Sequence, residues 1–525
     1  MSDDMPSRAG RREWAGLAVL VLPTLLISID VSVLHLAQPG LSADLRPSST
    51  QLLWINDVYG FLIAGFLITM GALGDRIGRR RLLLIGGAAF GPASALAAYA
   101  PNAELLIVAR AALGVAGATL MPSTLSLIRN MFRDPAQRTR AISLWMTGFS
   151  GGMVIGPVVG GVLLEYFWWG SVFLLGVPVM ALLTLLGPLL LPESRDPAPG
   201  RVDPPSVLLS LTGVIALVYG LKEIAAYGLS PAPAAIMAVG AVLTWAFVRR
   251  QRRLEDPMLD LGLLGRRRFG GSLGLLTLVM LIGPGLSLLT AQYLQLVLGL
   301  SPLQAGLWTL PPSIAVIAGF MAAPLLARRI RPGLLIAAGL AVSALGLALL
   351  TGTGTQRGLM LLVTGMTLFD LGFSPLAVLG TDMIVTAAPP ERAGAASALS
   401  ETSQEFGGAL GLAVFGGIAT VVYRLRIDPP GGVPDQAADQ AAETLGGATA
   451  VAGGLDGDLA AALLEGARAA FTDGLHAAAA AAAVLTAGAA ALAVILLRHV
   501  PPTSAVPSPD EPAQEAPAPT AGLTG

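Results

Sequence analysis

Apolar residues in this 525-residue chain recur in long runs that short polar segments separate. A helix needs about 20 mostly apolar residues to cross a bilayer, and fourteen runs approach or exceed that length. Strands are usually shorter than this, so the pattern predicts an all-α polytopic membrane protein. The runs lie near residues 15–37, 51–72, 82–100, 104–126, 140–164, 168–191, 206–221, 231–248, 270–298, 302–327, 333–351, 358–386, 393–421 and 473–497.

Basic residues are distributed unevenly over the polar segments between these runs. Alternate segments, counted from the N-terminus, carry 25 of the 32 Lys and Arg residues, and the remaining segments carry 6. Arg110 lies inside a run. Because cytoplasmic loops of membrane proteins are enriched in Arg and Lys, this bias predicts that both termini are cytoplasmic. It also supports an even number of spans.

Two short sequences are alike at equivalent places in the chain. Residues 137–143 open the fifth run and residues 391–397 open the thirteenth, each with Gln or Glu followed by Arg and a final Ser. The repeat predicts two pseudo-symmetric six-helix bundles around a substrate path, as in many transporters. The expected segments are a cytoplasmic N-terminus (1–14), an N-terminal bundle (15–191), a linker with two inserted helices (192–269), a C-terminal bundle (270–499) with an outer loop (422–472), and a disordered cytoplasmic tail (500–525).

Composition excludes several functional classes. Hydrophobic residues make up 54% of the chain and charged residues 12%, whereas soluble domains average about 25% charged. The net charge of −1 offers no basic surplus for nucleic acid, and cysteine is absent. The three histidines make a histidine-rich metal site improbable. No phosphate-binding loop with a Gly-Lys-Ser/Thr ending is present. We therefore expect no enzyme activity, no cofactor and no metal.

The loop between the second and third runs carries closely spaced glycines, one acid and a run of arginines. Its glycines permit a tight turn, and Asp75 can pair with an arginine or accept from a helix N-terminus. The loop resembles the signature loop of the major facilitator superfamily, in which it acts as a conformational latch. By this resemblance the latch comprises Gly71, Gly74, Asp75, Arg76, Gly78, Arg79 and Arg80.

Two further motifs narrow the resemblance. Arg110, an intramembrane arginine and therefore a functional candidate, resembles a span-four arginine that the family associates with proton coupling. The glycine-rich fifth run resembles the family's antiporter motif, with Pro157 expected to bend the helix. Together with fourteen spans, these motifs resemble the 14-helix drug:H⁺ antiporters, which expel quaternary ammonium compounds, methyl viologen, ethidium and fluoroquinolones. The antiporter motif consists of Gly152, Gly156, Pro157, Gly160 and Gly161.

Six acids lie within runs, and an intramembrane carboxylate is a functional candidate by default. By resemblance, Asp30 and Asp57 belong to the proton and substrate pathway; interhelical hydrogen bonding is the alternative for both. Glu401 and Glu405 share one helical face, with an interfacial capping role as the alternative for Glu401. Asp370 has no partner evident in the sequence, and Asp382 is expected at a helix end or gate. The proton-coupling and cation-binding set is Asp30, Asp57, Arg110, Asp370, Glu401 and Glu405.

Aromatic and thioether side chains suit flat cationic compounds through cation–π contacts and adaptable packing. Each such residue alone is more often a packing or interfacial residue. The tenth run contains no acid, which favours monovalent over divalent cations as substrates. The candidates for a substrate cavity are Tyr59, Trp145, Met146, Phe149, Tyr293 and Trp308.

The function expected from this resemblance is proton-coupled efflux of lipophilic monocations by alternating access across a bacterial inner membrane. The expected partners are small cationic drugs, protons and the lipid bilayer, with no nucleic acid, and the chain is expected to be a monomer. An exporter of an endogenous antibiotic or lipid, a nutrient importer, and a non-transporting scaffold or channel remain alternatives.

Overall fold

The computed structural model describes residues 9–47, 49–195, 203–227, 230–254, 257–259, 261–265, 267–300, 302–355, 358–389, 393–497 and 500. Residues 501–525, where a disordered tail was predicted, lie outside this part. Within it, 14 helical segments are long and apolar enough to cross a membrane. Each overlaps one of the fourteen runs, so the predicted number of spans is confirmed.

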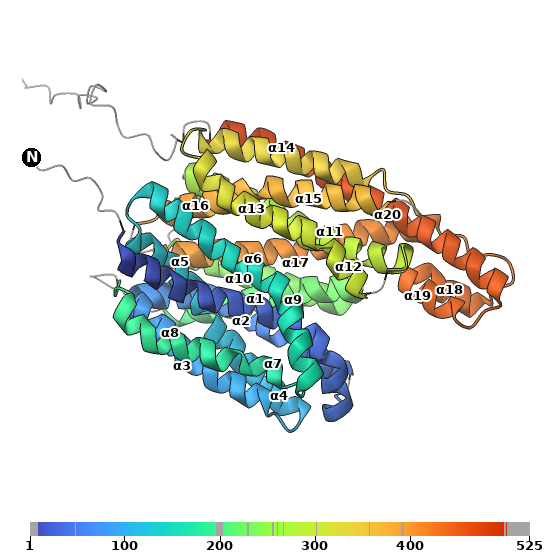
Figure 1. Cartoon of the computed structure of the whole chain (residues 1–525), viewed down its shortest axis with the longest axis horizontal. Helices are drawn as coiled ribbons and strands as arrows, with labels where there is room; N and C mark the ends of the chain where they lie inside the picture. Colours follow the sequence, from blue (N-terminus) through green and yellow to red (C-terminus); the bar gives the residue numbers. More distant parts are fainter. Residues whose placement is uncertain are drawn as a thin grey trace, which may run out of the picture.

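The first six spans form the first half of the molecule (Figure 1). They are built from α1 (Arg11–Leu45), α2 (Ser49–Ile77), α3 (Arg79–Ala98), α4 (Ala103–Gly117), α5 (Leu120–Met131), α6 (Pro135–Tyr166), α7 (Ser171–Leu174) and α8 (Gly176–Leu190). The inserted pair comprises α9 (Pro204–Tyr227) and α10 (Pro231–Gln251), followed by the 3₁₀ helix η1 (Leu261–Gly265).

The second half follows η1 and contains the last six spans. Its elements are α11 (Arg267–Gln292), the π-helix η2 (Tyr293–Val297), α12 (Pro302–Trp308), α13 (Leu310–Leu326), α14 (Pro332–Leu350), α15 (Leu359–Pro375), the π-helix η3 (Leu376–Gly380), α16 (Thr381–Ala387), α17 (Ala393–Arg426), α18 (Asp435–Glu443), α19 (Leu445–Ala452) and α20 (Gly457–Leu497).

Three spans predicted as single runs are interrupted, and proline accounts for each break. A proline ring clashes with the carbonyl four residues earlier and removes one helical hydrogen bond. Pro122 lies four residues after Ala118, where α4 gives way to α5. Pro178 stands in the same relation to the end of α7, and Pro312 to the end of α12.

Each half has its own apolar core, and a seam joins them. One buried cluster draws on residues 263–497, and the other draws mainly on residues 17–191 with a few second-half side chains such as Phe320. Across the seam α2 packs on α17, and α6 packs on α13. Gly71 allows the first contact, because a Cβ there would lie 2.5 Å from Ala398 Cβ and 2.7 Å from the Gly394 carbonyl oxygen.

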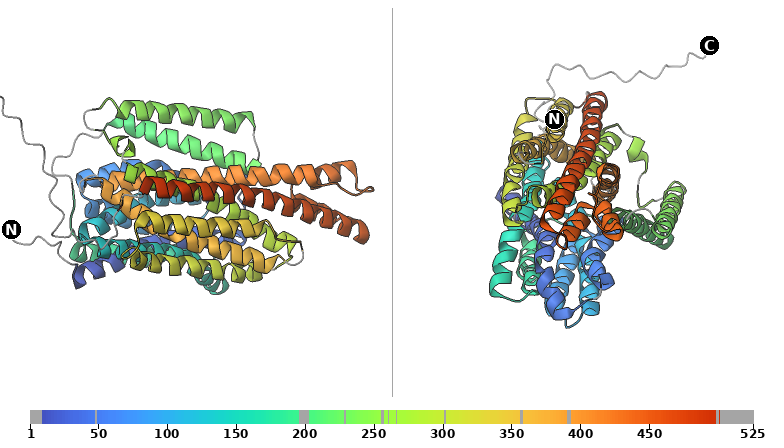
Figure 2. Two further views of the ribbon diagram at one scale, coloured as in Figure 1. Left: turned by 90° about the horizontal axis from the view of Figure 1, so that it is seen from above. Right: turned by 90° about the vertical axis from the view of Figure 1, so that its right-hand side faces the viewer.

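The inserted pair lies on one flank of the bundle, as Figure 2 shows in green. α9 packs on both α2 and α17, so it covers the seam, and α10 packs on α9. Near one end of α9, Tyr219 stacks on Trp54 with ring centroids 6.2 Å apart. Near the other, Arg250 and Asp203 pair in two hydrogen bonds of 2.5 and 2.8 Å, which join the two inserted helices.

Helices α17 and α20 extend beyond the other spans at one end of the bundle (Figure 2). The last part of the predicted outer loop, from Gly457 on, is the first part of α20. The rest of the predicted outer loop is also largely helical, since α17 continues to Arg426 and α18 and α19 follow. The Tyr423 hydroxyl donates to the Ala441 carbonyl at 2.8 Å and fastens α18 to α17.

Candidate transport site and gate

Asp30 of α1 and Arg110 of α4 form a buried ion pair within the first half. Arg110 Nη1 donates to Asp30 Oδ2 at 2.7 Å, and Arg110 Nε donates to the Ile55 carbonyl of α2 at 3.1 Å. The two side chains are 2% and 12% exposed. A charge buried this deeply requires a partner and hydrogen bonds. The pair therefore fixes three helices together and compensates the Asp30 charge.

Tyr59 of α2 lies where this pair meets the second half. The Arg110 guanidinium lies 4.6 Å from the Tyr59 ring centroid, in cation–π geometry. Gly114 permits the approach of α4, because a Cβ there would lie 2.7 Å from the Tyr59 carbonyl oxygen. Among the described residues, the buried Tyr59 hydroxyl has no hydrogen-bond partner.

The second half contributes Glu401 and Glu405, one turn apart on α17. Glu401 is half-buried and Glu405 is exposed, and the two charges act on each other. No hydrogen bond or ion pair joins the Glu401 carboxylate to another described residue. The same holds for Asp370, which is half-buried on α15. These two acids thus lack the basic partner that Asp30 has.

Asp57 is half-buried on α2, two residues before Tyr59. By resemblance, Asp30 and Asp57 both belong to the proton and substrate pathway. In the structure Arg110 links Asp30 to α2, because it also bonds the Ile55 carbonyl. A shared role for Asp30 and Asp57 stays a prediction.

The aromatic candidates fall into two groups. Trp145 is 3% exposed and donates from Nε1 to Thr124 Oγ1 at 3.1 Å. Tyr293 is fully buried and donates to the Gly354 carbonyl at 2.5 Å. Both are packed in a buried apolar cluster, which favours the packing alternative, and their place in a substrate cavity stays a prediction. Met146, Phe149 and Trp308 are half-buried and stay predictions.

The glycine motif of the fifth span sets the packing of α6 on α1. A Cβ at Gly152 would lie 2.5 Å from the Leu25 carbonyl oxygen, and one at Gly160 would lie 2.7 Å from Val33 Cγ1. Gly156 is buried, whereas a Cβ added at Gly161 would have no atom within 4 Å. Helix α6 is continuous through Pro157, whose side chain lies outside the described part. Gly152 and Gly160 therefore hold the helix that carries Asp30.

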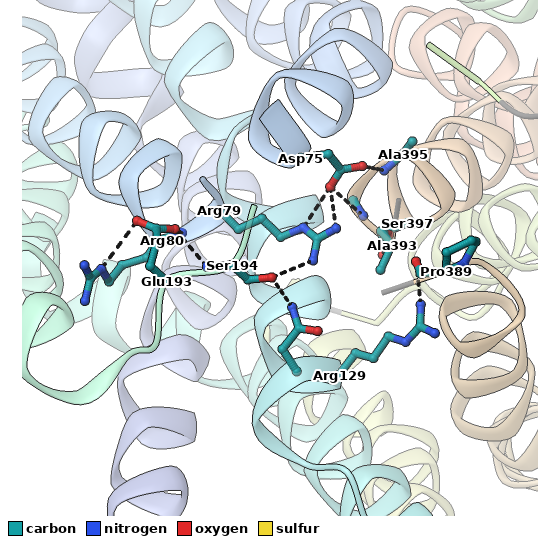
Figure 3. A network of polar contacts seen from close by, with 12 residues as sticks. Asp75, Arg79, Arg80, Arg129, Glu193, Ser194, Pro389, Ala393, Ala395 and Ser397 are labelled. Atoms are coloured by element: carbon teal, nitrogen blue, oxygen red, sulfur yellow. Dashed lines mark hydrogen bonds and ion pairs between the residues drawn. The ribbon is translucent and has the colours of Figure 1, made fainter. Parts of the chain in front are cut away.

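The two halves are fastened together at the arginine-rich end, the end of the bundle that carries Arg79, Arg80, Arg129 and Arg138. Figure 3 shows the contacts of the first three of these arginines. Asp75, at the end of α2, accepts from the backbone N–H of Gly394 at 3.1 Å and of Ala395 at 3.0 Å. These N–H groups begin α17 and lack helical partners of their own. Asp75 also accepts from Arg79 Nε at 2.8 Å. One carboxylate thus joins the predicted latch to the second half.

The rest of the latch is anchored to the segment after α8. The Arg79 N–H donates to the Ser194 carbonyl at 2.9 Å, and the Arg80 N–H donates to Glu193 Oε1 at 3.2 Å (Figure 3). Gly78 has a φ of +105°, a conformation that favours glycine. A Cβ at Gly74 would lie 3.1 Å from Leu82 Cδ2. Arg76 is half-buried in the last turn of α2.

Further contacts close the same end. Arg138 of α6 pairs with Asp382 of α16 at 2.6 Å, and Thr139 Oγ1 donates to the same carboxylate at 3.1 Å. Arg129 donates to the Pro389 carbonyl at 3.2 Å. The Ser143 hydroxyl donates to the Phe320 carbonyl. Asp382 therefore lies in the interface between the halves, as expected for a gate residue.

Sequence reasoning missed the polar residues behind the latch. Asn130 Nδ2 donates to Ser194 Oγ at 2.7 Å, and Ser194 also accepts from Arg79 Nη1 at 3.4 Å. An acid and a serine directly after the sixth run were the only available signal. Within the described ranges, no group of three or more His, Asp or Glu side chains is arranged to hold a metal.

Comparison with known proteins agrees with this architecture. The "Multidrug efflux pump LfrA" of Mycolicibacterium smegmatis is 48% identical over 471 residues, which cover 89% of this chain and 93% of that protein. The "Methyl viologen resistance protein SmvA" of Salmonella typhimurium is 37% identical over 476 residues, 88% of this chain and 93% of that protein.

A solved structure gives the same fold. The human organic anion transporter MFSD10 (TETRAN) superposes with a TM-score of 0.55 at 16% identity, covering 90% of this chain and 98% of that chain. The family model described as Major Facilitator Superfamily matches residues 20–412. With fourteen spans in two halves that meet at a latched seam, the chain belongs to the major facilitator superfamily.

Proposed function

We propose that this protein is a proton-coupled multidrug efflux antiporter that exports lipophilic monocations by alternating access. The observation that carries the proposal is the buried pair of Asp30 with Arg110 beside the Tyr59 ring, on α2, which packs on the helix of Glu401 and Glu405, α17. The similarity to LfrA and SmvA, which are named for multidrug efflux and methyl viologen resistance, supports the substrate class.

Exchange takes place at the acids of α17. A carboxylate without a basic partner is compensated either by a proton or by a bound cation, and one site cannot hold both charges at once. Glu401 is the acid of this helix without a basic partner among the described residues, and a cationic drug bound there, beside Glu405, leaves when a proton takes its place. Tyr59 offers an aromatic face to the same region, which suits a flat cation. Asp30 stays compensated by Arg110 and positions α1 for this exchange.

The gate supplies the alternation. The contacts of Asp75, Arg129 and Arg138 hold the arginine-rich end closed, and we assign that end to the cytoplasm because its loops carry most of the arginines. Opening toward the cytoplasm requires these contacts to break. The membrane potential contributes about 2.3 kcal/mol per charge for each 100 mV.

Proton-coupled efflux requires a membrane that carries a proton gradient. The proposal places the chain in the inner membrane of a bacterium, with both termini on the arginine-rich, cytoplasmic side.

Transport in reconstituted vesicles tests this function. The full chain is placed in liposomes with an imposed pH gradient, and ethidium movement is followed by fluorescence. We expect uphill ethidium movement that stops when an ionophore collapses the gradient. Movement that persists after collapse, or no movement of any cation with the gradient present, would reject proton-coupled export. Asp30→Asn and Glu405→Gln variants, expressed at parental levels, are expected to move ethidium more slowly.

A further inference from the structure

A polar pocket of about 270 Å³ opens at the arginine-rich end, within the first half. It lies between the first turn of α1, the end of α5 with its following loop, and the end of α8. Its lining includes two arginines, one acid, one amide and an apolar wall. These residues are Arg12, Glu13, Asn130, Arg133, Leu190 and Pro192.

The charges of this pocket are unequally engaged. The Glu13 carboxylate already accepts from the Gly10 N–H at 2.7 Å, and Arg12 uses Nη2 to donate to the Leu189 carbonyl at 2.8 Å. Arg133 is exposed, and no contact joins its guanidinium to another described residue. Two guanidinium groups and one carboxylate leave a single positive charge facing the pocket.

The pocket also lies at the depth of the membrane surface. Trp14, one turn into α1, packs edge-on against Phe132 with ring centroids 4.9 Å apart. Aromatic residues near the ends of spans mark the level of lipid headgroups. Leu190 and Pro192 add an apolar wall beside the charged groups. Basic pockets between helices at this level suit anionic headgroups.

A chain of hydrogen bonds leads from the pocket to the latch. Asn130, in the lining, donates to Ser194 Oγ at 2.7 Å. Ser194 accepts from Arg79, and Arg79 donates to Asp75 (Figure 3). Asp75 in turn accepts from the first N–H groups of α17. A ligand that orders Asn130 and the segment after α8 therefore acts on the groups that join the two halves.

We propose that this pocket binds the phosphodiester headgroup of an anionic membrane lipid and that its occupancy stabilises the closed arginine-rich end. The guanidinium groups of Arg12 and Arg133 hold the phosphate, since arginine matches phosphate geometry. Its single negative charge matches the net positive charge of the pocket. The lipid acts through Ser194, which orients Arg79 toward Asp75. The inference does not depend on which compound is transported.

The binding test measures phosphatidylglycerol retained by the purified full-length protein, by native mass spectrometry during lipid titration. We expect Arg133→Gln and Arg12→Gln each to weaken retention about fivefold. Arg133→Lys, which keeps the charge, should retain more phosphatidylglycerol than Arg133→Gln. The matched control is Arg252→Gln, an exposed arginine that follows α10, and it leaves retention unchanged. Equal retention in the double variant and the parent, or an equal loss in the control, would overturn the proposal.

A second arm separates a lipid from a soluble phosphate ester. Glycerol 3-phosphate is added to protein in phosphatidylcholine nanodiscs, in place of phosphatidylglycerol. The readout is the distance between the two spin labels described in the next paragraph. We expect glycerol 3-phosphate to leave that distance unchanged at concentrations where phosphatidylglycerol shortens it. If glycerol 3-phosphate acts as strongly as the lipid, the assignment to a membrane lipid is wrong.

A third arm tests the connection to the latch. Because the chain has no cysteine, spin labels at Arg81→Cys and Arg331→Cys, two exposed positions in different halves, are the only labels present. Adding phosphatidylglycerol should increase the population with the shorter distance. Ser194→Ala should abolish that response while phosphatidylglycerol retention stays parental. A response that survives in Ser194→Ala, or that is missing in the parent, would contradict the coupling.

Discussion

Away from the arginine-rich end, where Asp382 pairs with Arg138, the acids of the two halves are compensated in different ways. In the first half, Asp30 is paired with Arg110, whose Nε donates to a backbone carbonyl and whose guanidinium lies over the Tyr59 ring. In the second half, no basic group pairs with Glu401 or Asp370 among the described residues. Under the proposed function, one half carries a charge whose compensation is built in, and a mobile proton or cation compensates Glu401 and Asp370 of the other half.

This difference assigns separate tasks to the halves. Removing one member of a buried ion pair leaves an uncompensated charge and costs stability. Removing an acid that has no fixed partner costs little stability but removes a place where cargo binds. The first half is therefore expected to respond to mutation mainly in stability, and the second half mainly in transport.

The largest effect is expected for Glu401→Gln combined with Glu405→Gln. An amide neither releases a proton nor attracts a cation as a carboxylate does, so ethidium export in vesicles should fall to the level of vesicles without protein. The matched control is Glu465→Gln, an exposed acid on the projecting part of α20. Export at the parental rate in the double variant would remove α17 from the exchange site.

Next in size is the loss of stability in Asp30→Asn. This change leaves the Arg110 guanidinium without its counter-ion and should lower the free energy of unfolding by about 3–5 kcal/mol. Asp370 has no basic partner among the described residues, so Asp370→Asn should change the free energy of unfolding by less than about 1 kcal/mol. Chemical denaturation in detergent measures both. Equal losses in the two variants would erase the contrast between the halves.

A smaller loss is expected when α1 is pushed away from α6. Gly152→Ala places a methyl group 2.5 Å from the Leu25 carbonyl oxygen, so the backbones must separate. We expect a loss of about 1–3 kcal/mol, accompanied by slower export because Asp30 moves with α1. Gly161→Ala in the same motif meets no atom within 4 Å and serves as the control. Similar unfolding curves for the two alanine variants would refute this packing argument.

The smallest effect concerns the inserted pair, outside the comparison between the halves. Hydrogen bonds from Arg250 hold the pKa of Asp203 below its ordinary value. The Asp203 carboxylate is therefore protonated less readily in the folded protein than in the unfolded chain. The contribution of the Asp203–Arg250 pair to stability is complete above about pH 4. It disappears as the pH falls below that value. The difference between the parent and Asp203→Asn should be small at pH 7 and vanish in acid; a difference that grows in acid would contradict the assignment.

Much of the fold could be predicted because membrane insertion leaves a strong pattern in the sequence. The fourteen runs and the arginine bias required only local reading. The breaks at Pro122, Pro178 and Pro312 follow from proline chemistry, but whether a break or a bend results depends on packing. The helices between Arg426 and Gly457 leave no signal in apolar periodicity, because that segment is polar and Gly-rich.

The candidate site was only partly predictable for a related reason. Arg110 and the acids stand out because charge inside an apolar run is rare. The local sequence pattern does not show which acid Arg110 compensates, because its contact with Asp30 joins residues 80 positions apart. Tyr293 looked like Tyr59 in sequence, yet it is bonded within the second-half core. For Ser194, behind the latch, the only signal was its place beside an acid in the polar segment after the sixth run.

Proton release on drug binding tests the division between the halves most directly. Ethidium is added to purified protein in weakly buffered detergent solution, and released protons are measured with a pH indicator. The parent and Asp30→Asn should release protons as ethidium binds, whereas the Glu401→Gln and Glu405→Gln double variant should release none. Proton release that survives in the double variant but is lost in Asp30→Asn would contradict the account.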